Sequence, residues 1–262
     1  MFAAIATIAL YLAAAGVLGA SAWSGQARGK LGWLPLAVLA IIFHVELHAL
    51  TWRNASGPDM HFFAALSLSG LGMAILTATM ALRGQMAALG VIVFPLAALV
   101  ALLYRIVGPS TPTAMGWQLQ LHVWFALLAY ATLAIAAVLA MLLWVQERAL
   151  RERRFHRWLR VLPPLTELET LLFRTITAGF VLLSVALLAG ALFVHDLFAQ
   201  HLAHKTVLSL LAWAVFGLLL LGRWRRGWRG RQAVRLTLIA MLLLVLAFFG
   251  SKFAYDFLIQ RG

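Results

Sequence analysis

Eight long runs of apolar residues dominate this sequence, and each is long enough to cross a lipid bilayer. A membrane-spanning helix needs about 20 consecutive, mostly apolar residues. The sequence therefore predicts an all-α fold, a polytopic transmembrane helix bundle of about eight spans, which forms a single transmembrane domain over residues 1–262. The predicted spans are residues 2–22, 34–52, 62–82, 87–106, 118–145, 171–194, 205–222 and 233–257.

The composition also requires lipid as the main solvent of this chain. Charged residues make up 11% of the sequence, whereas soluble domains carry about 25%. In lipid, the backbone polar groups must be satisfied within helices or a closed barrel. The apolar runs are continuous and lack the short alternating segments of a barrel. Helices in a lipid bilayer are therefore the predicted structure.

Arginine-rich loops orient the predicted bundle. Residues 147–160 hold six arginines and residues 223–231 hold five, and two predicted spans separate these segments. Loops rich in Lys and Arg stay on the cytoplasmic side of a membrane. Arg28 with Lys30, and Arg83, fall on the same side when the spans are counted back. Both termini are therefore predicted to lie on the non-cytoplasmic side.

The net charge of +13 follows from these loops. Contact with anionic lipids accounts for such charge, so nucleic acid is not an expected partner. Residues 147–162 also combine arginines with Leu150, Phe155 and Trp158, a pattern typical of a basic amphipathic segment at the membrane surface.

Two glycines mark a packing face in the sixth predicted span. Gly179 and Gly190 are eleven residues apart, about three turns of an α-helix. They therefore share one face, where small residues let another helix approach closely in lipid.

Histidines gather toward the outer membrane face in this topology. Seven of the eight are predicted there: His44, His48, His61, His122, His195, His201 and His204. Ionisable residues within spans are costly to bury and are functional candidates for that reason. Some of these histidines, however, need be no more than residues at a wet interface.

His44 and His48 allow a metal-binding interpretation. They are spaced i, i+4, so they share a helix face, which suits two ligands of one divalent ion. Glu46 lies on the opposite side of that helix, where pairing with Arg53, or protonation, would relieve its burial. A proton or ion relay through Glu46, His44, His48 and Lys205 is a further interpretation.

Haem is another candidate ligand for the outer histidines. A b-type, bis-His haem needs one imidazole on each side of its ring, and two histidines of one helix cannot easily provide that. His122 in the fifth span and His204 at the start of the seventh are suitable, with His44 or His48 as an alternative partner. Trp117, Trp124 and Trp213 offer aromatic walls, although membrane-interface belts explain tryptophans equally well.

Catalytic signatures are absent from the sequence. It has no cysteine, so thiolate catalysis and thiolate ligation are excluded within this chain. It also has no phosphate-binding glycine loop, no G-x-S-x-G and no H-E-x-x-H. An enzyme with its own complete active site is therefore not expected.

Three stretches in the second half resemble the cytochrome c assembly protein family, which includes CcsA-, ResC- and HemX-like proteins. They are WQLQLHVWFALLAYATLAIAAVLAMLLWVQERALR (117–151), LPPLTELETLLFRTITAGFVLLSVALLAGALF (162–193) and the stretch from His204 to Phe253. The nearest likeness is to the YpjD-like inner-membrane branch. The resemblance implies a haem-binding protein of a bacterial inner membrane, engaged in haem handling or cytochrome c biogenesis, with other membrane assembly factors as possible partners.

The resemblance also implies a role for His122, because an outward histidine that opens this helix is an external haem ligand in the family. His204, Lys205 and Thr206, followed by Trp213, occupy the region of a family motif that follows a tryptophan-rich segment. That segment is missing here, and HDLFAQHLAHKT stands in its place. The family's second external histidine is also missing near the end of the last helix. The chain is therefore expected to bind haem without being a complete haem–cytochrome c ligase.

Overall fold

The structure is a computed structural model of the whole chain, and it describes residues 2–24, 32–53, 58–82, 87–109, 116–152, 163–193 and 203–250. All regular elements in these ranges are helical, so the all-α prediction is confirmed. The eight long helices are α1 (Phe2–Ser24), α2 (Leu34–Arg53), α3 (Phe62–Leu82), α4 (Gly90–Val107), α5 (Trp117–Arg151), α6 (Leu165–Phe193), α7 (Ala203–Arg226) and α8 (Gly230–Val245). A short 3-10 turn (Ala87–Leu89) precedes α4, and a π-helical turn (Leu246–Gly250) follows α8.

All eight helices are long and apolar enough to cross a membrane, which makes the chain a multi-pass membrane protein of the helical class. Many of their large apolar side chains are exposed, as expected for helices that face acyl chains. The orientation with both termini outside stays a prediction.

α6 and α8 begin clearly earlier than the apolar runs predict. α6 begins at Leu165, directly after Pro163 and Pro164, and its polar first turn hid this start from a search for apolar residues. α8 begins at Gly230, whose backbone N–H donates a hydrogen bond to Glu169 Oε1 of α6 at 2.8 Å. That bond satisfies one of the amides that an α-helix leaves free at its start. Residues 251–257 of the last predicted span lie outside the described part of the chain.

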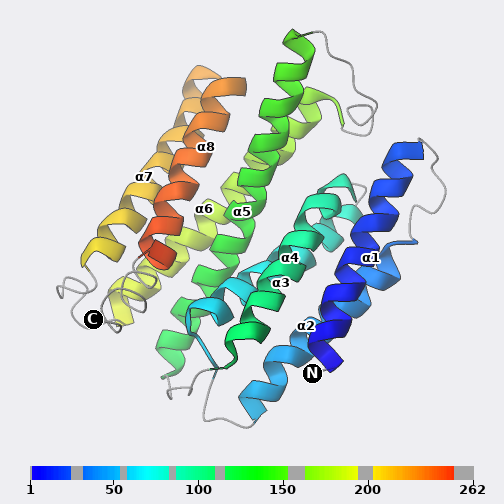
Figure 1. Cartoon of the computed structure of the whole chain (residues 1–262). Helices are drawn as coiled ribbons and strands as arrows, with labels where there is room; N and C mark the ends of the chain where they lie inside the picture. The colour runs from blue at the N-terminus through cyan, green and yellow to red at the C-terminus, as the bar shows by residue number, and fades with distance from the viewer. Residues whose placement is uncertain are drawn as a thin grey trace, which may run out of the picture. The chain divides into compact units, whose positions relative to one another are not determined.

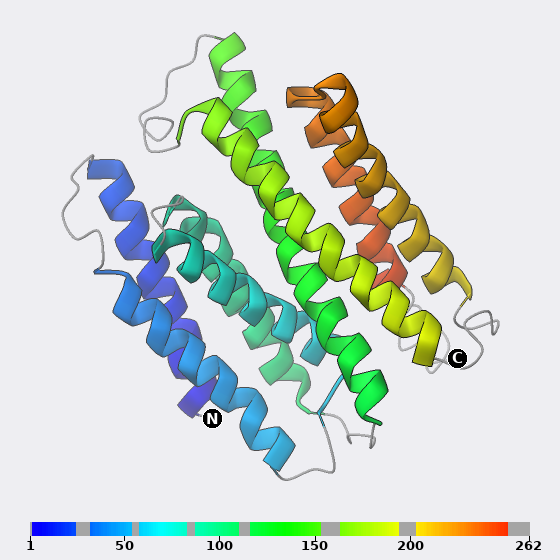
Figure 2. The same cartoon turned by 180° about the vertical axis from the view of Figure 1, so that it is seen from behind.

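The contacts divide the chain into two compact units, and the single domain expected from the sequence stays a prediction. The first unit holds α1 to α4 (Figures 1 and 2), in which α1 packs on α2 and α4, and α3 packs on α2 and α4. Its core combines small and aromatic side chains: Tyr11, Ala14, Ala15, Leu18, Trp33, Ala37, Ala40, Ala74, Phe94, Ala97 and Ala98. The alanines let these helices approach closely, as membrane helices do.

The second unit holds α5 to α8. α5 and α6 run side by side as the green and yellow-green helices of Figures 1 and 2, while α7 and α8 form a second closely packed pair. The two predicted packing glycines of α6 both face α5. A Cβ atom at Gly179 would lie 2.6 Å from side-chain atoms of Leu133, and one at Gly190 would lie 3.0 Å from the ring of His122. Only glycine permits this separation of the two helices without displacing those side chains.

Candidate functional site

His44 and His48 lie on the buried face of α2, where their exposed fractions are 0% and 1%. Their i, i+4 spacing places the two imidazole rings 5.7 Å apart between centroids, with 26° between the ring planes. Fully buried histidines inside a spanning helix require polar partners, because lipid and an alanine-rich core supply none.

One hydroxyl group joins the two histidines. The Nε2 atoms of His44 and His48 lie 2.9 Å and 3.0 Å from the Oγ atom of Ser67 on α3. On the other side of His44, its Nδ1 atom lies 3.3 Å from the hydroxyl of Tyr11 on α1. We call these four residues (Tyr11, His44, Ser67 and His48) the histidine–serine cluster. Side chains of three helices thus form one buried hydrogen-bonded chain.

The single hydrogen of the Ser67 hydroxyl limits the directions that the hydrogen bonds of this cluster can take. Ser67 has one hydroxyl hydrogen, so it donates to one imidazole nitrogen and accepts from the other. When both rings are neutral, one histidine is therefore protonated on Nε2 and the other on Nδ1. Either histidine can take either role, and Tyr11 accepts or donates accordingly. The cluster can therefore reverse its hydrogen-bond direction when a proton enters at one end and leaves at the other.

Further polar groups continue from His48. The His48 ring stacks on Tyr104 of α4 at 4.6 Å between centroids, and the ring of His61 lies 5.7 Å from the same tyrosine. His61 Nδ1 lies 2.7 Å from Oδ1 of the buried residue Asp59. Within the described residues, His48 Nδ1 and His61 Nε2 are buried nitrogens without a hydrogen-bond partner. His61 Nε2 is therefore available to bind a proton or a ligand when Nδ1 donates to Asp59, and His48 Nδ1 is available in the arrangement in which His48 Nε2 carries the hydrogen.

The metal interpretation of His44 and His48 gains a geometric basis but no complete ligand set. Their Nε2 atoms converge on one point, the position of the Ser67 oxygen. Among the residues that the structure describes, however, no group of three or more His, Asp or Glu side chains is placed to hold a metal ion. Glu46 is exposed on the far side of α2, and no ion pair joins it to the exposed Arg53 in the described ranges.

His122 forms the second candidate site, in the other unit. It is half-buried on α5 against α6, and its Nδ1 atom lies 2.8 Å from the carbonyl oxygen of Ala186. A carbonyl oxygen only accepts hydrogen bonds, so Nδ1 carries the hydrogen and Nε2 of the neutral ring keeps its lone pair. Gly190 provides the space for this ring. The imidazole is thus held in one orientation with a nitrogen available as a ligand.

Aromatic side chains lie near His122 at the ends of α5 and α6. The rings of Trp117 and Phe193 are 6.1 Å apart between centroids, with Trp117 64% exposed. Trp117 precedes His122 by five residues, or about 7 Å along the helix axis. An exposed aromatic pair therefore lies about one and a half helical turns from His122, at the same end of α5.

His204 occupies a different environment. It is exposed in the first turn of α7, and no hydrogen bond or ring contact joins it to His122 within the described ranges. The pairing of these two histidines stays a prediction. His195 and His201 lie outside the described residues.

Sequence reasoning found the histidines but missed most of their partners. Ser67, Tyr11 and Tyr104 carry no sequence signal, because they lie on other helices and no spacing along the chain links them to His44 or His48. The Asp59–His61 pair had a usable signal, since a carboxylate two residues before a histidine sits at the start of a span.

These features define a polytopic helical membrane protein with buried and half-buried histidines. The chain belongs to the cytochrome C assembly protein family, whose sequence profile matches residues 31–259. This match confirms the family resemblance seen in the sequence, and the identity to YpjD given below confirms the likeness to that branch.

Three relatives illustrate the range of the family. The inner membrane protein YpjD of Escherichia coli (strain K12) is 29% identical over 230 residues, which cover 84% of this chain and 87% of that protein. A cytochrome c biogenesis protein CcsA of Synechococcus sp. (strain CC9605) is 22% identical over 87% of this chain and 85% of its own length. An uncharacterized 28.8 kDa protein of Azospirillum brasilense is 41% identical over 56% of this chain and 55% of its own length. No solved structure matches the chain.

Proposed function

We propose that this chain is a haem-binding protein of a bacterial inner membrane that handles haem in cytochrome c biogenesis, with His122 as an axial ligand. The observation that carries the proposal is the orientation of His122, whose Nδ1–H is bound to Ala186. A backbone carbonyl that holds one ring nitrogen directs the other toward a metal, as in many metal-binding histidines. Family membership and the likeness to an inner membrane protein of Escherichia coli support the same assignment.

The residues near His122 fit a haem of the b type. Trp117 and Phe193 present an exposed apolar surface suited to a flat macrocycle, and haem would supply an iron for histidine ligands such as His122. His204, which belongs to the same unit as His122, is the proposed second ligand. The chain lacks the tryptophan-rich segment of complete ligases, so its proposed role is haem binding or transfer without thioether formation.

An absorption spectrum of the purified protein tests this proposal. The protein is isolated in detergent from haem-replete cells, as wild type and as His122→Ala, His204→Ala and His156→Ala. We expect a Soret band in the wild type that is lost in His122→Ala and unchanged in His156→Ala, which the sequence places at the opposite membrane face. A shifted band in His204→Ala identifies the second ligand. A colourless wild type that takes up no added haem contradicts the proposal.

The alternative function is an accessory or transport protein that binds a divalent metal ion or a partner through its outward histidines. The observation behind this alternative is that the Nε2 atoms of His44 and His48 both point to one position, which the Ser67 oxygen occupies. Metal analysis separates the two functions. A stoichiometric metal that disappears in His44→Ala, in a protein without haem, supports the alternative.

A further inference from the structure

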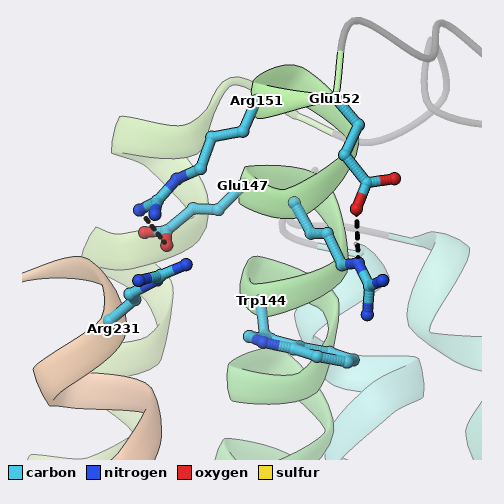
Figure 3. A pocket seen from close by; sticks show the side chains of 6 residues that line it. Trp144, Glu147, Arg151, Glu152 and Arg231 are labelled. Atoms are coloured by element: carbon cyan, nitrogen blue, oxygen red, sulfur yellow. Dashed lines mark hydrogen bonds and ion pairs between the residues drawn. The ribbon is translucent and has the colours of Figure 1, made fainter.

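A charged pocket opens where α5 ends beside the start of α8, within the second unit (Figure 3). Its volume is about 380 Å³. The pocket is lined by Trp144, Glu147, Arg148, Arg151, Glu152 and Arg231. None of these residues takes part in the histidine sites described above. The pocket lies at the arginine-rich end of the helices, which the sequence predicts to be cytoplasmic.

Two of the three arginines are paired along α5. Arg148 donates to Glu152 at 2.8 Å, whereas Arg151 and Glu147 are separated by 3.6 Å, a longer contact. Both arginines of α5 keep part of their hydrogen-bonding capacity in these pairs, since a guanidinium has five N–H donors.

Arg231 is the third arginine, and it comes from α8. Within the described ranges, no ion pair joins it to a carboxylate. Figure 3 shows its guanidinium on the same side of the pocket as the Arg151–Glu147 pair. Its charge is thus uncompensated by any direct protein partner in this part of the chain, and it faces the pocket.

The carboxylate of Glu147 is directed to the start of α8. A Cβ atom at Gly230 would lie 2.6 Å from Glu147 Oε1, and the backbone of Gly230 has a φ of +54°, which disfavours any other residue there. The N-terminal end of a helix carries partial positive charge and favours a carboxylate. The helix start therefore offsets part of the negative charge of Glu147, and the pocket remains positive.

The base of the pocket is apolar. Trp144 is 46% exposed and lies seven residues before Arg151, about 10 Å along the helix axis. The guanidinium of Arg148 lies over its ring at 5.7 Å. Tryptophans are enriched at the level of lipid headgroups, and Trp144 lies near the arginine-rich end of α5. One wall of the pocket thus suits a phosphate group, and its base suits the glycerol and upper acyl carbons attached to that phosphate.

We propose that this pocket binds the phosphate headgroup of an anionic phospholipid. Arg231 and Arg151 hold the phosphate oxygens from two helices, and Trp144 lies against the apolar part of the same lipid. Guanidinium groups bind phosphate through two parallel N–H···O contacts, which a lysine cannot reproduce. A bound lipid bridges α5 and α8 at this end and thereby stabilises the unit.

The thermal unfolding of the full-length protein in detergent micelles tests the proposal. Unfolding temperatures are compared after addition of phosphatidylglycerol, phosphatidylcholine or soluble glycerol phosphate. The variants are Arg231→Gln, Arg231→Lys and Arg151→Gln. The matched control is Arg229→Gln, which removes the same charge from an exposed residue next to α8 that does not line the pocket.

We expect phosphatidylglycerol to raise the unfolding temperature of the wild type and of Arg229→Gln, with most of that rise lost in Arg231→Gln and Arg151→Gln. Arg231→Lys should keep only part of it. An equal loss of the phosphatidylglycerol effect in Arg229→Gln would show that the lipid is attracted to positive charge in general, and it would contradict a specific site at this pocket. An equal rise with glycerol phosphate, or with phosphatidylcholine, overturns the assignment to an anionic lipid.

Discussion

The Nε2 atoms of His44 and His48 both form a hydrogen bond with the hydroxyl of Ser67 in the core of the first unit. Among the described residues, Ser67 is the one hydrogen-bond partner of these two Nε2 atoms. We predict that Ser67→Ala lowers the free energy of unfolding by about 1–3 kcal/mol, the usual cost of leaving a buried polar group unsatisfied. Denaturant unfolding of the purified protein measures this loss. Ser69→Ala is the matched control, because the buried Ser69 bonds only within its own helix, to the Ala65 carbonyl. Equal losses in the two variants contradict the role of the cluster.

Gly190 sets the position of the His122 imidazole. A methyl group there would lie 3.0 Å from Cε1 and 3.1 Å from Nδ1 of that ring, closer than most real contacts. We predict that Gly190→Ala displaces the ring from Ala186 and weakens haem binding by about tenfold, equivalent to ~1.4 kcal/mol. A haem titration followed at the Soret band measures the change.

Gly217→Ala is the control for that titration. A methyl group at Gly217 would meet Phe180 at 3.5 Å, an ordinary contact distance. Its haem affinity should equal that of the wild type. Unchanged affinity in Gly190→Ala would show that the ring of His122 does not need its present orientation to bind haem.

The relative placement of side chains could be predicted from the sequence only where all of the residues concerned lie on one helix. The i, i+4 spacing of His44 and His48 and the opposite placement of Glu46 follow from helix geometry alone, and both are present in the structure. The bond to Ser67 could not be predicted in the same way. It depends on the rotation of α3 relative to α2, which the packing of many small side chains determines.

At the scale of elements, the end of α8 is held by a side chain of α5. The Tyr130 hydroxyl donates to the Leu244 carbonyl at 2.7 Å, immediately before the π-helical turn Leu246–Gly250. A π-turn alters the regular i to i−4 pattern and leaves carbonyls in need of other partners. We predict that Tyr130→Phe increases amide hydrogen exchange in residues 244–248 and lowers the free energy of unfolding by about 1 kcal/mol.

Exchange elsewhere provides the internal control for Tyr130→Phe. The α3–α4 contact lies in the other unit, where the amides of Ser69 to Ala74 should keep their wild-type protection. A uniform increase along the chain would indicate general destabilisation in place of a local role for this bond.

The presence of each helix could be predicted because each span is a continuous apolar run. The residues at which the helices begin and end could not be predicted in this way. The start of α6 lies six residues before the predicted one, since Thr166, Glu167 and Glu169 interrupt the apolar pattern while remaining helical. Glu169 then holds the first amide of α8. Polar residues at helix ends form contacts with other helices. A hydropathy pattern measures only how unfavourable such residues are in lipid, so it places the end of the helix too early or too late.

For the whole molecule, the orientation in the membrane is a prediction that the absence of native cysteine makes simple to test. Arg226 at the end of α7 and Pro109 after α4 are both exposed. Arginine-rich loops resist translocation, so Arg226→Cys should react with a membrane-impermeant maleimide only after the inner membrane is permeabilised. Pro109→Cys should react in cells whose inner membrane is intact. The reverse labelling pattern would place His122 on the cytoplasmic side and the arginine pocket outside. The haem proposed at His122 and the anionic phospholipid proposed at the pocket would then have to come from the side of the membrane opposite to the one predicted here.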